Sequence, residues 1–173
     1  MHKARPFLLA IAAFTALTAM ALASTTAQVH KQHTEVYARY FFSGETAYRA
    51  IELDGLKIKI TYFKDADKKC KNWIEQRPCW TEKDLVTKEA PVTKRELADF
   101  VSLINRSKFL LLEKTYGGAA AGQRFYAQTI KVKLGEIQQE VVYQSFPEAA
   151  PRPQAFTKVA DWLSKIVTRK FAL

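Results

Sequence analysis

Two segments of the chain repeat apolar residues at helical spacing, so both are predicted to be amphipathic helices. The first begins with a capping box, Thr93 to Glu96, and the second follows Pro151 and Pro153. An amphipathic helix needs another layer to cover, so both helices are expected on one face of a common sheet. The stripes are Leu97, Phe100, Val101 and Ile104 in the first segment, and Phe156, Val159, Ala160, Leu163, Ile166 and Val167 in the second.

A first β-hairpin is predicted from residues 46–53 and 56–63, which have strand composition and flank the dipeptide Asp54–Gly55. This dipeptide is typical of type I′ turns, because Gly tolerates the positive φ that such turns require. In the expected register the facing pairs are Leu53 with Leu56, Glu52 with Lys57, and Ile51 with Ile58.

A second hairpin is predicted from residues 125–134 and 137–146, joined by Gly135–Glu136. Gly at the first turn position fits a type II′ turn. The expected pairs are Leu134 with Ile137, Ile130 with Val141, and Lys131 with Glu140, whose opposite charges support the register.

These segments predict an α+β fold with a mainly antiparallel sheet of two β-hairpins and a leading strand over residues 35–42. The expected order after the leading strand is ββα-ββα, with both amphipathic helices on one face. A basic, turn-rich excursion over residues 64–80 separates the first hairpin from the first helix. An apolar anchor at 109–112 and a flexible connection at 117–122 follow that helix.

The first 23 residues have the pattern of a secretory signal peptide. Lys3 and Arg5 provide positive charge, an uncharged apolar region extends from Phe7 to Leu22, and a small-x-small pattern ends at Ala23. We therefore expect a secreted or periplasmic protein. The alternative is an uncleaved membrane anchor, because the apolar region is nearly long enough to cross a bilayer.

Cleavage after Ala23 leaves a polar, flexible leader over residues 24–34 and a length suited to one α+β domain over 35–173. Removing Lys3 and Arg5 lowers the net charge from +10 to +8. An exported basic protein is attracted to anionic envelope components or to an acidic protein partner, whereas nucleic acid is not expected there. No further segment approaches the length of a membrane span.

The two cysteines, Cys70 and Cys79, are expected to form a disulfide, because close cysteines pair in an oxidising compartment. The loop-entropy relation gives this short ring roughly 2.7 kcal/mol of stabilisation. A redox-active role would favour the closer C-x-x-C spacing, which is absent.

The inventory of catalytic residues is poor, so we predict a protein that is not an enzyme and uses no cofactor or metal. All three histidines, His2, His30 and His33, precede the predicted domain, which excludes histidine-based triads and zinc sites within it. An enzyme that uses only carboxylates or lysines is the remaining catalytic alternative. Cleavage after Ala27 would instead place His30 third in the mature chain, a position that can bind Cu(II) together with the terminal amine.

The remaining candidate site is the loop that the disulfide closes. Tryptophan and arginine dominate binding hot spots, and a covalent ring lowers the entropic cost of ordering them. The alternative is that both tryptophans fold back over the sheet and make the loop a structural plug. The candidate binding residues are Lys69, Lys71, Trp73, Arg77 and Trp80.

The second half of the chain also shows a family pattern. It consists of Glu96 to Ile104, Phe109 to Leu112, Arg124 to Tyr126 before the hairpin, and Phe156 to Ile166 as the closing helix. Over roughly residues 93–167 the chain resembles small secreted or periplasmic proteins of the emfourin type. This resemblance implies an inhibitor of metalloproteases and assigns no residue to the inhibitory contact. The long first half, the disulfide loop and the basicity depart from the pattern.

The export signal and the cysteines yield a prediction about the mature product. Its mass should correspond to a chain that begins at Ser24, and neither Cys70 nor Cys79 should react with an alkylating reagent before reduction. Mass spectrometry of the exported protein checks both points. Retention of residues 1–23, or alkylation without reduction, would contradict the prediction.

Overall fold

A computed structural model describes residues 35–118, 125–145, 148 and 150–173 of the chain. The predicted signal peptide, the predicted leader over 24–34 and the copper alternative at His30 lie outside these residues, as does most of the predicted connection over 117–122. Within the described residues, no helix combines the length and the apolar character needed to cross a lipid bilayer.

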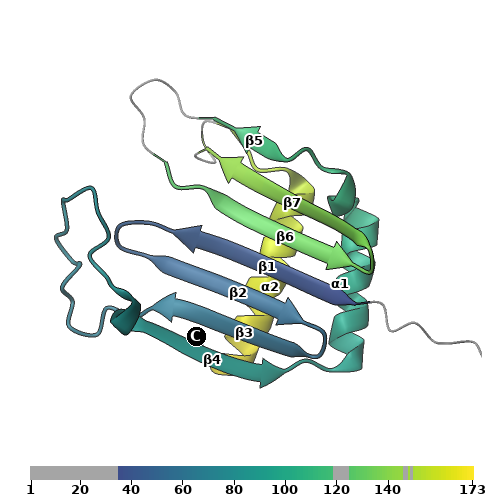
Figure 1. Ribbon diagram of the computed structural model, residues 1–173, viewed down its shortest axis with the longest axis horizontal. Helices are drawn as coiled ribbons and strands as arrows, with labels where there is room; N and C mark the ends of the chain where they lie inside the picture. Colours follow the sequence, from purple (N-terminus) through teal and green to yellow (C-terminus); the bar gives the residue numbers. More distant parts are fainter. Residues whose placement is uncertain (1–34, 119–124, 146–147, 149) are drawn as a thin grey trace, which may run out of the picture. The chain divides into compact units, whose positions relative to one another are not determined.

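The described strands form a mixed sheet in the order β4-β3-β2-β1-β6-β7-β5, in which β5 pairs with β7 in parallel and the other pairs are antiparallel (Figure 1). The α+β class is therefore confirmed. The strands are β1 (Val36–Ser43), β2 (Tyr48–Asp54), β3 (Lys57–Phe63), β4 (Leu85–Pro91), β5 (Thr115–Gly117), β6 (Gln128–Leu134) and β7 (Ile137–Gln144).

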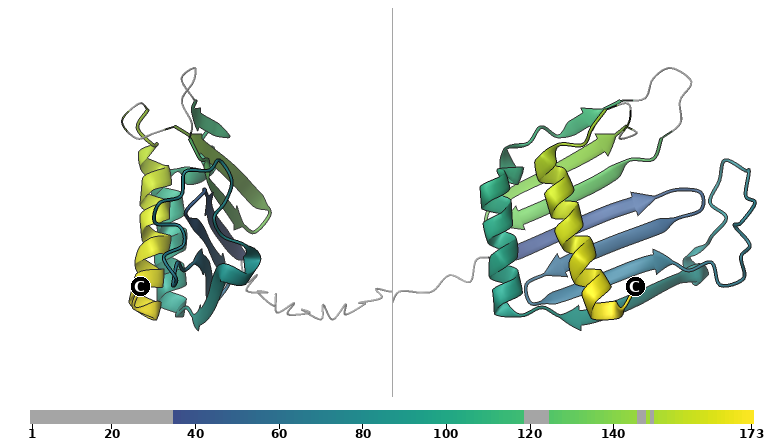
Figure 2. Two further views of the ribbon diagram at one scale, coloured as in Figure 1. Left: turned by 90° about the vertical axis from the view of Figure 1, so that its left-hand side faces the viewer. Right: turned by 180° about the vertical axis from the view of Figure 1, so that it is seen from behind.

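The helices α1 (Lys94–Ser107) and α2 (Gln154–Phe171) lie on the same face of the sheet and leave the other face open (Figure 2). The α1 capping box is confirmed, because the Thr93 N–H donates to Glu96 Oε2 at 2.7 Å and the Glu96 N–H donates to Thr93 Oγ1 at 3.2 Å. Short 3₁₀ turns, η1 (Glu82–Asp84) and η2 (Phe109–Leu111), precede β4 and follow α1.

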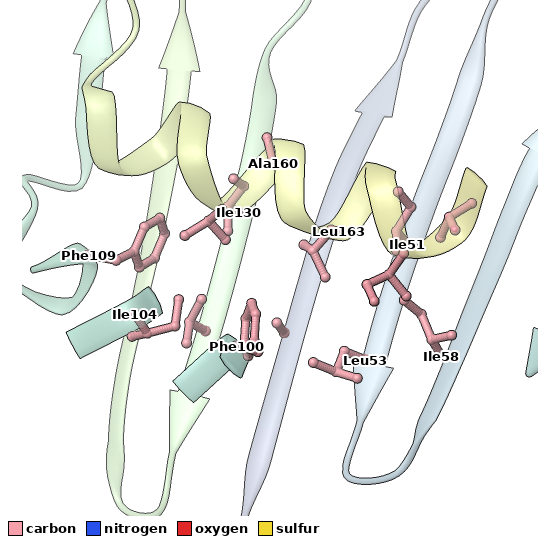
Figure 3. Packing of buried hydrophobic residues seen from close by; sticks show 14 of the residues in the cluster. Ile51, Leu53, Ile58, Phe100, Ile104, Phe109, Ile130, Ala160 and Leu163 are labelled. Carbon is pink, nitrogen blue, oxygen red and sulfur yellow. The ribbon is translucent and has the colours of Figure 1, made fainter. Parts of the chain in front are cut away.

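The core fills the space between the helices and the sheet (Figure 3). Every residue predicted for the stripe of α2 is buried, and the stripe of α1 buries Phe100 and Ile104 while Leu97 and Val101 pack at the margin. Side chains alternate between the faces of a strand, so residues two apart on β1, β2, β3, β6 and β7 supply the sheet half of the core. These are Val36, Ala38, Ile51, Leu53, Ile58, Ile60, Ile130, Val132, Val141 and Tyr143.

Glu96 links the two helices as well as capping α1. Its carboxylate accepts from Arg169 at 2.5 Å and pairs with Lys170 at 3.2 Å, so the last turn of α2 lies beside the first turn of α1. Burial alone would raise the pKa of Glu96, but hydrogen bonds from the Thr93 backbone and from Lys170 together hold the pKa below its usual value. The rings of Phe100 and Trp162, 4.8 Å apart, add an apolar contact between the helices.

The predicted ββα-ββα order and the two-hairpin layout are wrong, because the sheet contains two strands that the sequence pattern did not indicate. β4 lies between the excursion and α1, and it pairs with β3 along the edge of the sheet. Its sequence, LVTKEAP, includes Lys88, Glu89 and Pro91, which are typical of an edge strand and weaken any strand pattern. The three residues of β5 are too few to show a period at all.

The register of the first hairpin also differs from the expected one. The structure pairs Leu53 with Ile58 and Glu52 with Lys59, two residues away from the predicted partners. Gly55–Leu56 forms the turn, and Asp54 instead closes the ladder opposite Lys57. Gly55 therefore occupies the first turn position, as Gly135 does in the second hairpin, whose predicted pairs are all confirmed. A shift of two residues keeps each side chain on its face, so the core prediction is unaffected.

Gly55 provides a test of this turn. Its φ is +52°, and a Cβ built there would meet no atom within 4 Å, so conformation alone should set the cost of a side chain. Gly55→Val should lower the free energy of unfolding by about 1–2 kcal/mol, because a β-branched residue disfavours positive φ. Gly55→Asn should cost much less, since Asn tolerates this region. Chemical denaturation measures both, with Glu136→Ala as a mild control, and equal losses for Val and Asn would contradict the turn geometry.

Candidate functional site

The segment between β3 and β4, residues 64–84, extends beyond the ends of the strands and is called the disulfide loop (Figure 1). The predicted Cys70–Cys79 disulfide is confirmed and closes a ring within the loop, with the two Cα atoms 5.7 Å apart. Cys70 is buried, and the other residues of the ring are exposed or half-buried.

The part of the loop that contains Cys79 and Trp80 is anchored to the turn between β1 and β2. The backbone N–H of Cys79 donates to the Glu45 carbonyl at 2.9 Å, and Trp80 Nε1–H donates to the Gly44 carbonyl at 2.9 Å. The Trp80 ring lies 5.0 Å from that of Tyr48 and 6.5 Å from that of Phe63. Tyr48 and Phe63 lie on the open face of the sheet, opposite the helices, so Trp80 covers one end of that face.

A second anchor joins the start of the ring to η1. Lys69 Nζ donates to Asp84 Oδ2 at 2.6 Å, and the Thr81 backbone N–H donates to the same oxygen at 2.7 Å. The Lys69 hydrogen bond, followed by that from Thr81, lowers the pKa of Asp84 to about 2. Lys69, predicted as a binding residue, is therefore paired with an acidic side chain of the same loop.

The tip of the loop has a different character. Trp73 is half-buried, its Nε1–H donates to the Arg77 carbonyl at 2.7 Å, and the Arg77 guanidinium lies 6.0 Å from the centre of its ring. Arg77 also pairs with Glu75 at 2.5 Å. Ile74 is 94% exposed, more than any other large hydrophobic residue that the structure describes.

Sequence reasoning missed Ile74, and Lys71 is the predicted candidate that simply lies exposed on the ring. The structure groups Trp73, Ile74 and Arg77 at the tip and places Trp80 with Lys69 at the base. A signal for Ile74 was present: a ring this short has no interior, so any apolar residue within it must face either solvent or the parent sheet.

Three carboxylates of the loop, those of Asp65, Glu75 and Asp84, have structural contacts. Asp65 Oδ2 accepts the Cys70 backbone N–H at 3.1 Å and so shapes the entry to the ring. The described residues contain no group of three or more His, Cys, Asp or Glu side chains placed to hold a metal ion.

No protein-family model matches the chain, and a search of curated proteins finds no match.

The Lys69–Asp84 anchor predicts a pH-dependent contact. The pKa of Asp84 is lowered in the folded protein. The contact therefore stabilises the loop fully at pH values above 3.8, the ordinary pKa of the group, and is lost as the pH falls through about 2. In Lys69→Met the carboxyl should titrate closer to 3.8. Lys71→Met removes the same charge two residues away and should leave the titration nearly unchanged. NMR titration of Asp84 measures all three proteins, and identical midpoints would show that Lys69 is no anchor.

Proposed function

We propose that this chain is an exported, non-enzymatic binding or inhibitor-like domain that contacts a protein partner through the tip of the disulfide loop. The observation that carries the proposal is the exposure of Ile74 beside Trp73 on a covalently closed loop. An apolar side chain at 94% exposure contributes almost nothing to folding, but it gains free energy when a partner removes it from water.

The internal contacts of the tip support this role. The hydrogen bond from Trp73 to the Arg77 carbonyl and the stacking of Arg77 near the indole restrain both side chains before any partner arrives. Trp and Arg are the residues that most often dominate binding energy, and a restrained pair loses less entropy on binding. Lys71 lies on the same ring and supplies positive charge at its margin.

The charge of the loop favours a contact that is mainly apolar. Residues 64–84 contain six basic and five acidic side chains, and two of the basic ones are paired within the loop, Lys69 with Asp84 and Arg77 with Glu75. A nearly neutral loop with an exposed isoleucine is suited to a hydrophobic pocket on a partner more than to an anionic polymer.

The class of partner is part of the proposal. The resemblance to emfourin-type inhibitors suggests a metalloprotease, and a narrow loop that extends beyond the strands is suited to a cleft. That resemblance covers residues 93–167 and leaves out the disulfide loop, so it does not identify the contact surface. Inhibition of a metalloprotease is therefore one readout of the experiment and not its premise.

The experiment compares Ile74→Asp with Leu111→Asp, a matched substitution at a residue that is 80% exposed on η2, away from the loop. Native secretome or periplasmic protein is passed over each immobilised variant, retained partners are identified by mass spectrometry, and inhibition of purified metalloproteases is measured in parallel. Ile74→Asp should lose the partner, whereas Leu111→Asp should keep it. Capture by wild type should persist at about 1 M NaCl, where the screening length is about 3 Å.

A second variant tests the remainder of the tip. Trp73→Ala combined with Arg77→Ala should also abolish capture and leave the melting temperature nearly unchanged, because the contacts of Trp73 with Arg77 and of Arg77 with Glu75 lie within the tip of the loop. Capture that survives both loop variants, or that Leu111→Asp weakens equally, would refute the proposed contact surface.

A further inference from the structure

The charge of the protein is concentrated on the helices. From Lys94 to Lys108 and across α2 there are five more basic than acidic side chains, whereas residues 35–173 as a whole have an excess of seven. The helical layer thus holds most of the excess in a small part of the chain. Its basic residues are Lys94, Arg95, Arg106, Lys108, Lys158, Lys165, Arg169 and Lys170, and its acidic residues are Glu96, Asp99 and Asp161.

The open face of the sheet is balanced by contrast. Basic and acidic residues alternate across its strands, and several are paired, including Glu52 with both Arg39 and Lys59 at 3.5 and 2.6 Å. Lys57 pairs with Glu89, and Lys133 pairs with Glu35. The excess positive charge of the protein is therefore concentrated on the helices and not on the open face of the sheet.

Six cations of the helical layer are exposed and take no part in the ion pairs centred on Glu96. Three of them, Arg95, Lys158 and Lys165, serve to test the surface, and the others are Lys94, Arg106 and Lys108. Lys165 lines a groove of about 310 Å³ between α1 and α2 together with Trp162, Ile166 and Arg169 from α2 and with Glu96 and Asp99 from α1. Trp162 is half-buried there, and its ring also contacts Phe100. The helical layer thus combines positive charge with an indole that keeps part of its surface accessible, and cations with tryptophan are also combined on membrane-surface helices.

We propose that the outer surface of α1 and α2 binds the anionic headgroup surface of a phospholipid bilayer. Two helices side by side present their cations over a broad layer, which suits an extended anionic surface, and tryptophan favours the boundary between headgroups and acyl chains. Leu173, two residues beyond the end of α2, is an apolar residue that is 41% exposed. This surface is separate from the disulfide loop, so the two proposals stand or fall independently.

The test is sedimentation with vesicles of phosphatidylcholine alone and of phosphatidylcholine mixed with phosphatidylglycerol. The wild-type protein should bind only the mixed vesicles and should be released by salt. Arg95→Gln, Lys158→Gln and Lys165→Gln combined should weaken binding about 100-fold, since each cation near an anionic membrane contributes a factor of about five. Thermal unfolding of this variant should match that of the wild type, because the three side chains are exposed.

The matched control is Lys64→Gln, Lys71→Gln and Lys83→Gln combined, which removes the same charge from exposed positions in the disulfide loop. It should retain most of the vesicle binding. Equal loss in the two triple variants would overturn the assignment to the helices, and failure of the wild type to bind mixed vesicles would overturn the proposal outright.

A second readout distinguishes a bilayer from a soluble polyanion. In a variant with Trp73→Phe and Trp80→Phe, Trp162 is the remaining indole, and brominated lipids should quench its fluorescence. Binding to heparin without quenching by brominated lipid would indicate a polymer as the ligand and would refute the bilayer. Because Ile74→Asp leaves the helices intact, it should bind vesicles as the wild type does, so a failed loop proposal and a failed helix proposal give different results.

Discussion

The structure depends on the pairing of β1 with strands from both halves of the chain. β1 pairs with β2, its neighbour in sequence, and with β6, which follows about ninety residues later. Tyr40 faces Ile51 on one side and Ile130 on the other, so the same face of each half is apolar. The glycines of both hairpin turns extend these ladders, since Gly55 donates to Val36 and Gly135 donates to Glu35. A shift of either ladder by one residue would turn the apolar face of one half toward water.

This dependence explains which elements the sequence predicts well. The capping box at Thr93, the stripes of α1 and α2, the second hairpin and the Cys70–Cys79 bond are all specified by residues close together in the chain. β4 and β5 are not, because each becomes a strand only through a partner that β3 or β7 supplies. The register of the first hairpin is predicted wrongly for a local reason. The dipeptide Asp54–Gly55 is itself typical of a two-residue turn, whereas the structure places Gly55 at the first turn position and Leu56 at the second.

The candidate site shows the same division between residue type and position. Composition selected Trp73, Arg77 and Trp80 together, yet Trp80 packs on the sheet while the other two contact each other at the tip. Lys69 was selected for its charge, which Asp84 neutralises. Ile74 was missed because the selection followed the residue types of binding hot spots, although a ring this short leaves an isoleucine no interior to occupy. The net charge of the chain likewise does not indicate that most of the excess positive charge lies on the helices, because the fold determines which basic residues share a layer.

The arrangement of the loop has a consequence for how this protein can change. The anchoring contacts made by Lys69, Trp80 and Asp84 lie outside the two cysteines, and the anchor at Cys79 uses a backbone N–H, which every residue except proline provides. The tip side chains lie between the cysteines. Substitutions within the ring can therefore accumulate while the scaffold stays intact, so related chains could acquire new specificities by drift in this segment alone. The same property makes the ring a natural place to graft or randomise a short peptide.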